Sequence, residues 1–107
     1  MKKSAFIVIL LCNCTSPFAG EASGLVSSIY IADDSASILF KLDADIKRTP
    51  RCNESGRFSL NLIKRGGMAA YMALLEAKRE KYTVLVEGLN TCANHWKSED
   101  ILNIQLH

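Results

Sequence analysis

The sequence predicts a small, mainly β domain in which one α-helix lies between the third and fourth of five strands. Three observations predict this class. Short segments alternate apolar and polar residues, as half-buried strands do, and the segment 66–81 is rich in strong helix formers. Cys52 and Cys92 bracket that helix and are placed to staple the domain.

The first residues read as an export signal that precedes the domain. Lys2 and Lys3 form a basic start, 5–11 is an uninterrupted apolar run, and 15–20 is polar and rich in small residues. This order of charge, apolar core and small residues is typical of a secretory signal peptide. The apolar run is much shorter than the roughly 20 residues that a membrane-spanning helix needs.

Cleavage of this signal is expected after Ala19 or after Ala22, which leaves a single domain taken as 23–107. Lipidation of Cys12 or Cys14 is not expected, because no small residue precedes either of them. We therefore predict a secreted or periplasmic protein of bacterial type, with no membrane span and residues 1–22 as the signal.

Charge and size exclude some function classes and call for a covalent staple. The formal net charge of the 107 residues is only +2, which is no electrostatic footprint for nucleic acid. A domain this small buries only about 60% of its unfolded surface, so its core alone is marginal. Once the signal is removed, Cys52 and Cys92 are the remaining cysteines, and an even pair in an exported domain indicates a disulfide. Two unrelated thiols are the alternative, and a zinc site lacks ligands because only His95 lies nearby.

The first two strands are expected over 24–32 and 36–46, joined by a turn at 33–35. The second has the cleanest alternation in the chain, with apolar residues from Ile38 to Ile46 on one face and mostly charged residues on the other. The pair is predicted to be a hairpin with water on its outside.

A loop at 47–56 and a third strand at 57–63 follow. Lys47, Arg48 and Arg51 form a basic cluster in the loop, which reads as a solvated surface or as a contact for an anionic group such as sialic acid.

The helix is expected over 66–81, with an apolar stripe made of Met68, Tyr71, Met72 and Leu75. A second stripe repeats alanine every four residues at Ala69, Ala73 and Ala77. It suits either packing on a sheet or contact with a helix of a neighbouring subunit. The basic last turn complements the helix dipole.

Strands at 82–89 and 101–106 close the domain, with a polar loop between them. Trp96 in this loop is expected to be a lid over the disulfide, the alternative being a platform for a sugar ring. His95 could be drawn beside Glu99 and Asp100 as a catalytic group, but a polar loop has the same composition by chance.

The order of three strands, a helix and two strands is that of an oligonucleotide/oligosaccharide-binding (OB) barrel. From Cys52 onward the chain resembles a group of small secreted bacterial proteins, similar in turn to the B subunits of AB-type toxins such as subtilase cytotoxin, pertussis-like toxins and cholera toxin. The residues that carry the resemblance are Cys52, Arg57, Phe58, Leu60, Leu62, Ala69, Ala77, Lys78, Cys92, Trp96, Glu99, Asp100 and Ile101. It implies a ring of five barrels with central helices, and glycan binding at the rim or side.

The predicted function is therefore a non-catalytic binding module for a glycan or a protein, with no cofactor and no metal. The candidate ligand contacts are Arg51, His95 and Trp96, and the alanine stripe is the candidate oligomer interface. The alternative is a periplasmic inhibitor or immunity-like protein that blocks another protein through its surface.

Overall fold

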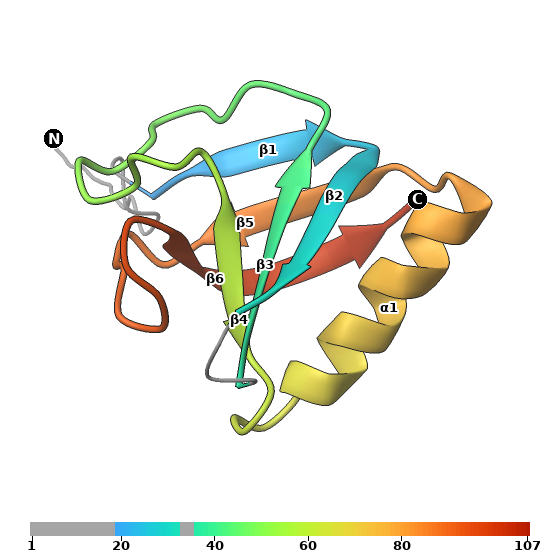
Figure 1. Ribbon diagram of the computed structural model, residues 1–107. Helices are drawn as coiled ribbons and strands as arrows, with labels where there is room; N and C mark the ends of the chain where they lie inside the picture. Colours follow the sequence, from blue (N-terminus) through green and yellow to red (C-terminus); the bar gives the residue numbers. More distant parts are fainter. Residues whose placement is uncertain (1–18, 33–35) are drawn as a thin grey trace, which may run out of the picture.

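The computed structural model describes residues 19–32 and 36–107, in which six strands curl into one sheet with a helix beside it (Figure 1). The mainly β class with one helix is confirmed for these residues, but the strand count is six instead of five. The strands are β1 (Glu21–Gly24), β2 (Val26–Ile31), β3 (Ser37–Leu42), β4 (Phe58–Asn61), β5 (Val84–Gly88) and β6 (Glu99–Leu106), and the helix α1 (Gly67–Glu80) lies between β4 and β5. The predicted turn at 33–35 lies outside the described residues.

The sixth strand arises because the predicted first strand is broken at Leu25. Its backbone carbonyl accepts a hydrogen bond from the amide of Asp43 at 2.7 Å, and β1 and β2 pair with different neighbours on either side of it. A register shift between Val26 and Ser28 interrupts the period of two, so Val26 and Ile29 are the residues of β2 that reach the core. The sheet also begins earlier in the chain than expected, since β1 starts at Glu21, before the predicted domain boundary at residue 23.

The two edge strands of the curled sheet, β1 and β2, follow one another directly along the chain. The strand order is β1-β5-β6-β4-β3-β2, and every pair is antiparallel except β4 with β6. Beyond the end of β3, Lys47 and Glu21 exchange two backbone hydrogen bonds of 2.8 and 2.9 Å. The chain after β3 therefore runs beside β1, and the sheet becomes a half-barrel.

The core fills the inside of this half-barrel with apolar side chains. Phe40 and Phe58 stack at its centre, with ring centroids 5.7 Å apart. The buried cluster comprises Ala22, Val26, Ile38, Phe40, Leu42, Phe58, Leu60, Leu74, Ala77, Val84 and Val86.

One end of the outer face of β3 is covered, whereas Lys41 on the same face is exposed, so the predicted hairpin with water on its outside holds only in part. Leu39 points away from the core cluster yet is buried, and Ser37 beside it donates a hydrogen bond to the carbonyl of Asn94 at 3.3 Å. The loop after β5 therefore lies over this face. Sequence alternation could not show this because the covering loop is polar and distant along the chain.

The helix is where the sequence predicts it, but its buried face is different. The residues that pack inward are Gly67, Leu74 and Ala77, with Ala70 and Tyr71 partly buried beside them, whereas Met68, Met72 and Leu75 are exposed. A side chain at Gly67 would overlap the backbone oxygen of Asn61, so this glycine lets the helix start lie directly on the end of β4. Because the helix lies close to the sheet at Gly67 and Ala77, these small residues face the core and the methionines face outward.

The helix ends one residue before the predicted boundary. Lys81 adopts a left-handed conformation (φ 61°), and the amide of Tyr82 donates to the carbonyl of Ala77 at 3.0 Å. Lys78 and Arg79 occupy the last turn, where positive charge complements the helix dipole as expected.

Candidate functional site

The candidate site is the surface formed by two loops, 47–57 before β4 and 90–98 before β6, which we call the linked-loop surface. Figure 1 shows these loops at the side of the sheet away from α1. A disulfide joins them between Cys52 and Cys92, whose Cα atoms are 6.0 Å apart. The predicted pairing is thus confirmed, and it ties the two loops into one unit.

The side chain of Asp100 fixes the conformation of the loop 90–98. Its buried carboxylate accepts hydrogen bonds from the amides of Ala93 and Asn94, both at 2.9 Å, and from the hydroxyls of Thr91 at 2.6 Å and Ser59 at 3.2 Å. Burial by itself would raise the pKa of Asp100, but these hydrogen bonds outweigh burial and hold the pKa below its ordinary value. The carboxylate therefore stays ionised and anchors the loop that contains Cys92.

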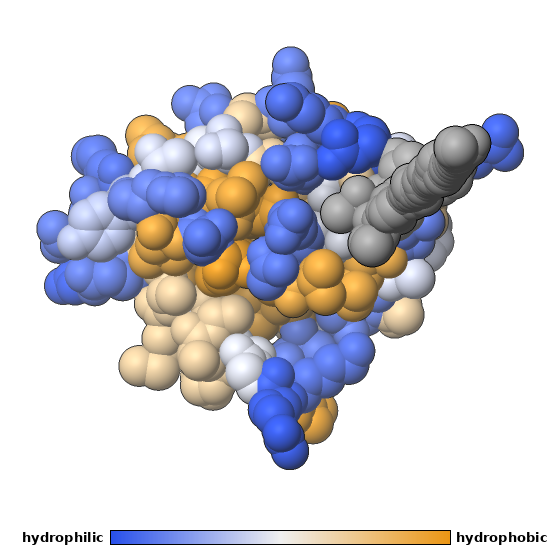
Figure 2. Space-filling view, turned by 180° about the vertical axis from the view of Figure 1, so that it is seen from behind, coloured by the Kyte–Doolittle hydropathy of each residue, from blue (hydrophilic) through white to orange (hydrophobic). Residues whose placement is uncertain are grey.

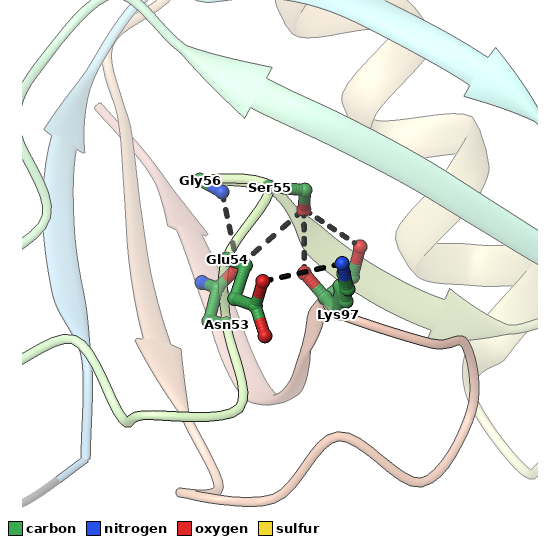
Figure 3. A network of polar contacts seen from close by, with 6 residues as sticks. Asn53, Glu54, Ser55, Gly56 and Lys97 are labelled. Atoms are coloured by element: carbon green, nitrogen blue, oxygen red, sulfur yellow. Dashed lines mark hydrogen bonds and ion pairs between the residues drawn. The ribbon is translucent and has the colours of Figure 1, made fainter.

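Ser55 connects the two loops through polar contacts with the second loop (Figure 3). Its hydroxyl donates to the carbonyl of Lys97 at 2.7 Å and lies 3.0 Å from the hydroxyl of Ser98. Because a hydroxyl carries one proton, Ser98 is the donor in the second contact. Lys97 also forms an ion pair with Glu54, with Nζ and Oε1 3.2 Å apart. These bonds supplement the disulfide.

Trp96 is presented to solvent by a tight turn over 95–98. The amide of Ser98 bonds to the carbonyl of His95 at 3.3 Å, and Lys97 has the positive φ (61°) that a type II turn requires at its third residue. The side chain of Trp96 is 75% exposed, and Lys97 Nζ lies 4.0 Å from its ring centroid. The expectation that Trp96 caps the core is therefore wrong. The turn aims the ring outward, and the side chains of Ser98 and Asp100 occupy the space beneath the loop.

His95 and Arg51 lie on the same two loops, but within the described residues neither side chain forms a hydrogen bond, ion pair or cation–π contact with the Trp96 ring. His95 is half-buried, and its Nδ1 lies 3.2 Å from the Trp96 carbonyl, which fits a proton on Nδ1. Arg51 is exposed and has no hydrogen bond or ion pair within residues 19–32 and 36–107. Of the basic cluster around it, Arg48 is engaged with Glu21 at 2.7 Å.

The structure does not join His95 to Glu99 or Asp100 by a hydrogen bond among the described residues. Both carboxylates accept hydrogen bonds from loop amides, and His95 bonds to neither of them in the part of the chain that the structure describes. Within residues 19–32 and 36–107, no three His, Cys, Asp or Glu side chains lie together so that they could hold a metal ion.

A cavity of about 150 Å³ lies next to the linked-loop surface and was not expected from the sequence. Asn94, Asp100 and Ile101 form one side of it, and the turn between β4 and α1 brings Lys64 and Arg65 to the other. The cavity joins residues that are far apart along the chain, so no local pattern could have predicted it.

The three alanines of the candidate oligomer interface do not share one outward face. Ala69 is exposed, Ala73 is half-buried and Ala77 is fully buried in the core cluster. The apolar surface that α1 leaves outside consists of Met68, Met72 and Leu75, which we call the outer helix face. Figure 2 shows apolar residues gathered on one side of the molecule among hydrophilic ones.

No protein-family model, curated protein or solved structure matches the chain. Within the described residues, no helix has the length and apolar character needed to cross a membrane.

Proposed function

We propose that this chain is an exported, non-catalytic binding module with an OB-type barrel that recognises a glycan through the linked-loop surface. The six strands reduce to five when β1 and β2 are counted together, since only Leu25 separates them. The combined first strand then borders both β3 and β5, and the strands before the helix and at the chain end pair in parallel. This connectivity supports the OB-type assignment and agrees with the resemblance to toxin B subunits.

The observation that carries the glycan proposal is the exposed ring of Trp96. Leaving such a large apolar surface in water forgoes the stabilisation that its burial would give. The loop beneath the ring is nevertheless held by a disulfide, by Asp100 and by Ser55. A rigid, exposed aromatic ring suits the apolar C–H face of a sugar, while Lys97 and Glu54 beside it offer polar partners for hydroxyl groups. Preorganisation lowers the entropic cost of binding.

The direct test uses a glycan array probed with the labelled, oxidised protein and with Trp96→Ala. Because Trp96 is the single tryptophan of the chain, its fluorescence reports on this surface alone. We expect a glycan hit whose titration changes the fluorescence, with at least a tenfold loss of affinity in Trp96→Ala, or about 1.4 kcal/mol. Trp96→Phe should retain part of the affinity, because a ring remains to stack on the sugar.

The matched control is Tyr82→Ala, which removes an exposed aromatic side chain between α1 and β5, away from the linked loops. It should bind glycans as the unaltered protein does. Binding that is equal in Trp96→Ala and the unaltered protein, or an array without hits, would reject the role of this surface.

The outer helix face supports a second candidate function, binding to a protein. Met68, Met72 and Leu75 lie along one side of α1 and are all exposed. A partner helix or sheet could bury them, either in a ring of five copies, as the toxin resemblance implies, or in an inhibitor bound to its target. Ala69 lies on the exposed part of the helix, but Ala77 is already used by the core.

Light scattering on a size-exclusion column separates these cases. A mass near five times that of the monomer, reduced to the monomer by Met72→Glu, would support the ring. A monomer would remove the ring and favour a heterologous protein partner. Lys78→Glu, a charge change in the exposed last turn of the same helix, is the control and should leave the mass unchanged.

A further inference from the structure

Glu99 is a buried carboxylate with one oxygen left bare. The residue is 0% exposed, and its Oε2 accepts hydrogen bonds from the amides of Gly20 at 2.9 Å and Asn90 at 3.0 Å. Its Oε1 is buried without a hydrogen-bond partner among the described residues. A buried polar atom without a partner destabilises the folded state, and more so when it is charged, so this oxygen calls for a donor.

Two glycines form the walls around this carboxylate. A Cβ atom on Gly20 would overlap Oε1, and a Cβ atom on Gly88 would overlap Oε2. The bare oxygen therefore lies close to Gly20, whose amide binds the other oxygen. The absence of a side chain there brings the backbone nitrogen of Gly20 close to the carboxylate.

Gly20 is also the residue that would become the first of the chain if the signal is cut after Ala19. We propose that cleavage occurs between Ala19 and Gly20 and that the new α-ammonium group of Gly20 forms a buried ion pair with Glu99. In this hydrolysis the C–N bond breaks and the hydroxyl of water joins the carbonyl carbon of Ala19. The nitrogen of Gly20 takes the other proton of that water and the proton of the new carboxyl group, which leaves an ammonium on Gly20 and a carboxylate on Ala19. The amide offers one N–H donor, whereas the ammonium offers three, so it can serve Oε2 and Oε1 together.

The alternative cut after Ala22 would damage the sheet. Ala22 is a core residue of β1, and Gly20 accepts a 2.8 Å hydrogen bond from the amide of Gly88. Glu21 would be lost as well, together with its two backbone hydrogen bonds to Lys47. Among the described residues, a cut after Ala19 removes one hydrogen-bond acceptor, the Ala19 carbonyl that Arg48 Nε contacts at 3.2 Å in an exposed position.

The first test follows the export part of the proposed function and determines where the chain is cut. The full precursor is expressed in a bacterial host, and the intact mass and N-terminal residue of the exported product are measured. We expect a product that begins at Gly20, and one that begins at Ser23 would overturn the inference. A precursor that stays uncut and inside the cell would also overturn it, and would in addition refute export, so the two failures are distinguishable.

The second test examines the ion pair without depending on export. Oxidised proteins that begin at Gly20 and at Ala19 are released from fusions and compared by urea unfolding at pH 7. The chain that begins at Gly20 should have an unfolding equilibrium constant at least tenfold smaller, because only its amine reaches Glu99. Equal stability of the two chains would overturn the inference.

Variants show whether Glu99 is the cause of the difference. In Glu99→Gln the two starting points should agree within twofold, whereas Glu87→Gln, on the neighbouring strand β5, should keep the difference. Should Glu99→Gln fail to fold, the reactivity of the Gly20 amine replaces it. In the folded chain that begins at Gly20, this amine should react with an amine-specific acylating reagent at least tenfold more slowly than after unfolding, and an equal rate would contradict the buried pair.

Discussion

At the scale of the residue, Asp100 gives the clearest energetic prediction. Its carboxylate accepts four hydrogen bonds, of which two come from backbone amides of the loop that contains Cys92. Asp100→Asn replaces one acceptor oxygen by an NH₂ donor and removes the charge. We expect a loss of about 1–3 kcal/mol in the free energy of unfolding at pH 7, measured with urea. Asp45→Asn, an exposed change, should leave the free energy nearly unaltered.

The same carboxylate sets the sign of a pH dependence. The pKa of Asp100 is lowered in the folded state, so its contribution is complete above the unfolded pKa of about 3.9. It is lost as the pH falls through the lower folded pKa. The difference in the free energy of unfolding between the unaltered protein and Asp100→Asn should therefore become smaller below about pH 4. A gap of constant size from pH 7 to the acid range would contradict this assignment.

Residue roles were predictable only where the residue type carries the role. Two cysteines in a domain predicted to be exported have few alternatives, so the pair Cys52–Cys92 could be named in advance. Trp96 could not be placed, because a packed ring and a presented ring have the same local sequence. Glu99 depends on Gly20, which is 79 positions away, and no local spacing encodes that contact.

At the scale of the element, the orientation of α1 can be tested with two adjacent leucines. Leu74 is 0% exposed and Leu75 is 44% exposed. Leu74→Ala should cost about 2–5 kcal/mol because it leaves a cavity, whereas Leu75→Ala should change the free energy of unfolding by about 0.5 kcal/mol or less. Urea unfolding is compared at concentrations where both variants are monomeric by light scattering. A larger loss of stability for Leu75→Ala than for Leu74→Ala would mean that the helix buries the face predicted from the sequence.

The elements were predicted better than their faces. Helix formers located α1 to within one residue at each end, because propensity and the flanking glycines act locally. The buried face depends instead on how closely the helix approaches β4, which Gly67 permits. Hydrophobicity favoured the methionines, whereas close packing selected Gly67 and Ala77. In the same way, the break at Leu25 follows from strand pairing and left no signal in the alternating pattern.

At the scale of the whole molecule, the disulfide staples the weakest seam of the sheet. β4 and β6 form the parallel pair, and their ladder contains only Phe58 with Glu99 and Ser59 with Asp100. The loops that carry Cys52 and Cys92 enter these two strands directly. The bond therefore closes a long stretch of chain and also holds the two halves of the half-barrel together.

Replacing both cysteines by serine should lower the free energy of unfolding by about 2–4 kcal/mol, because the unfolded chain regains the entropy of a loop of sequence separation 40. Native-state hydrogen exchange should also locate the effect. The amide of Glu99, which donates across the seam to Arg57 at 3.1 Å, should lose far more protection than amides of the β2–β3 hairpin, since local opening precedes global unfolding. An equal loss of protection throughout the sheet would mean that the disulfide acts on the unfolded chain alone and does not hold the seam.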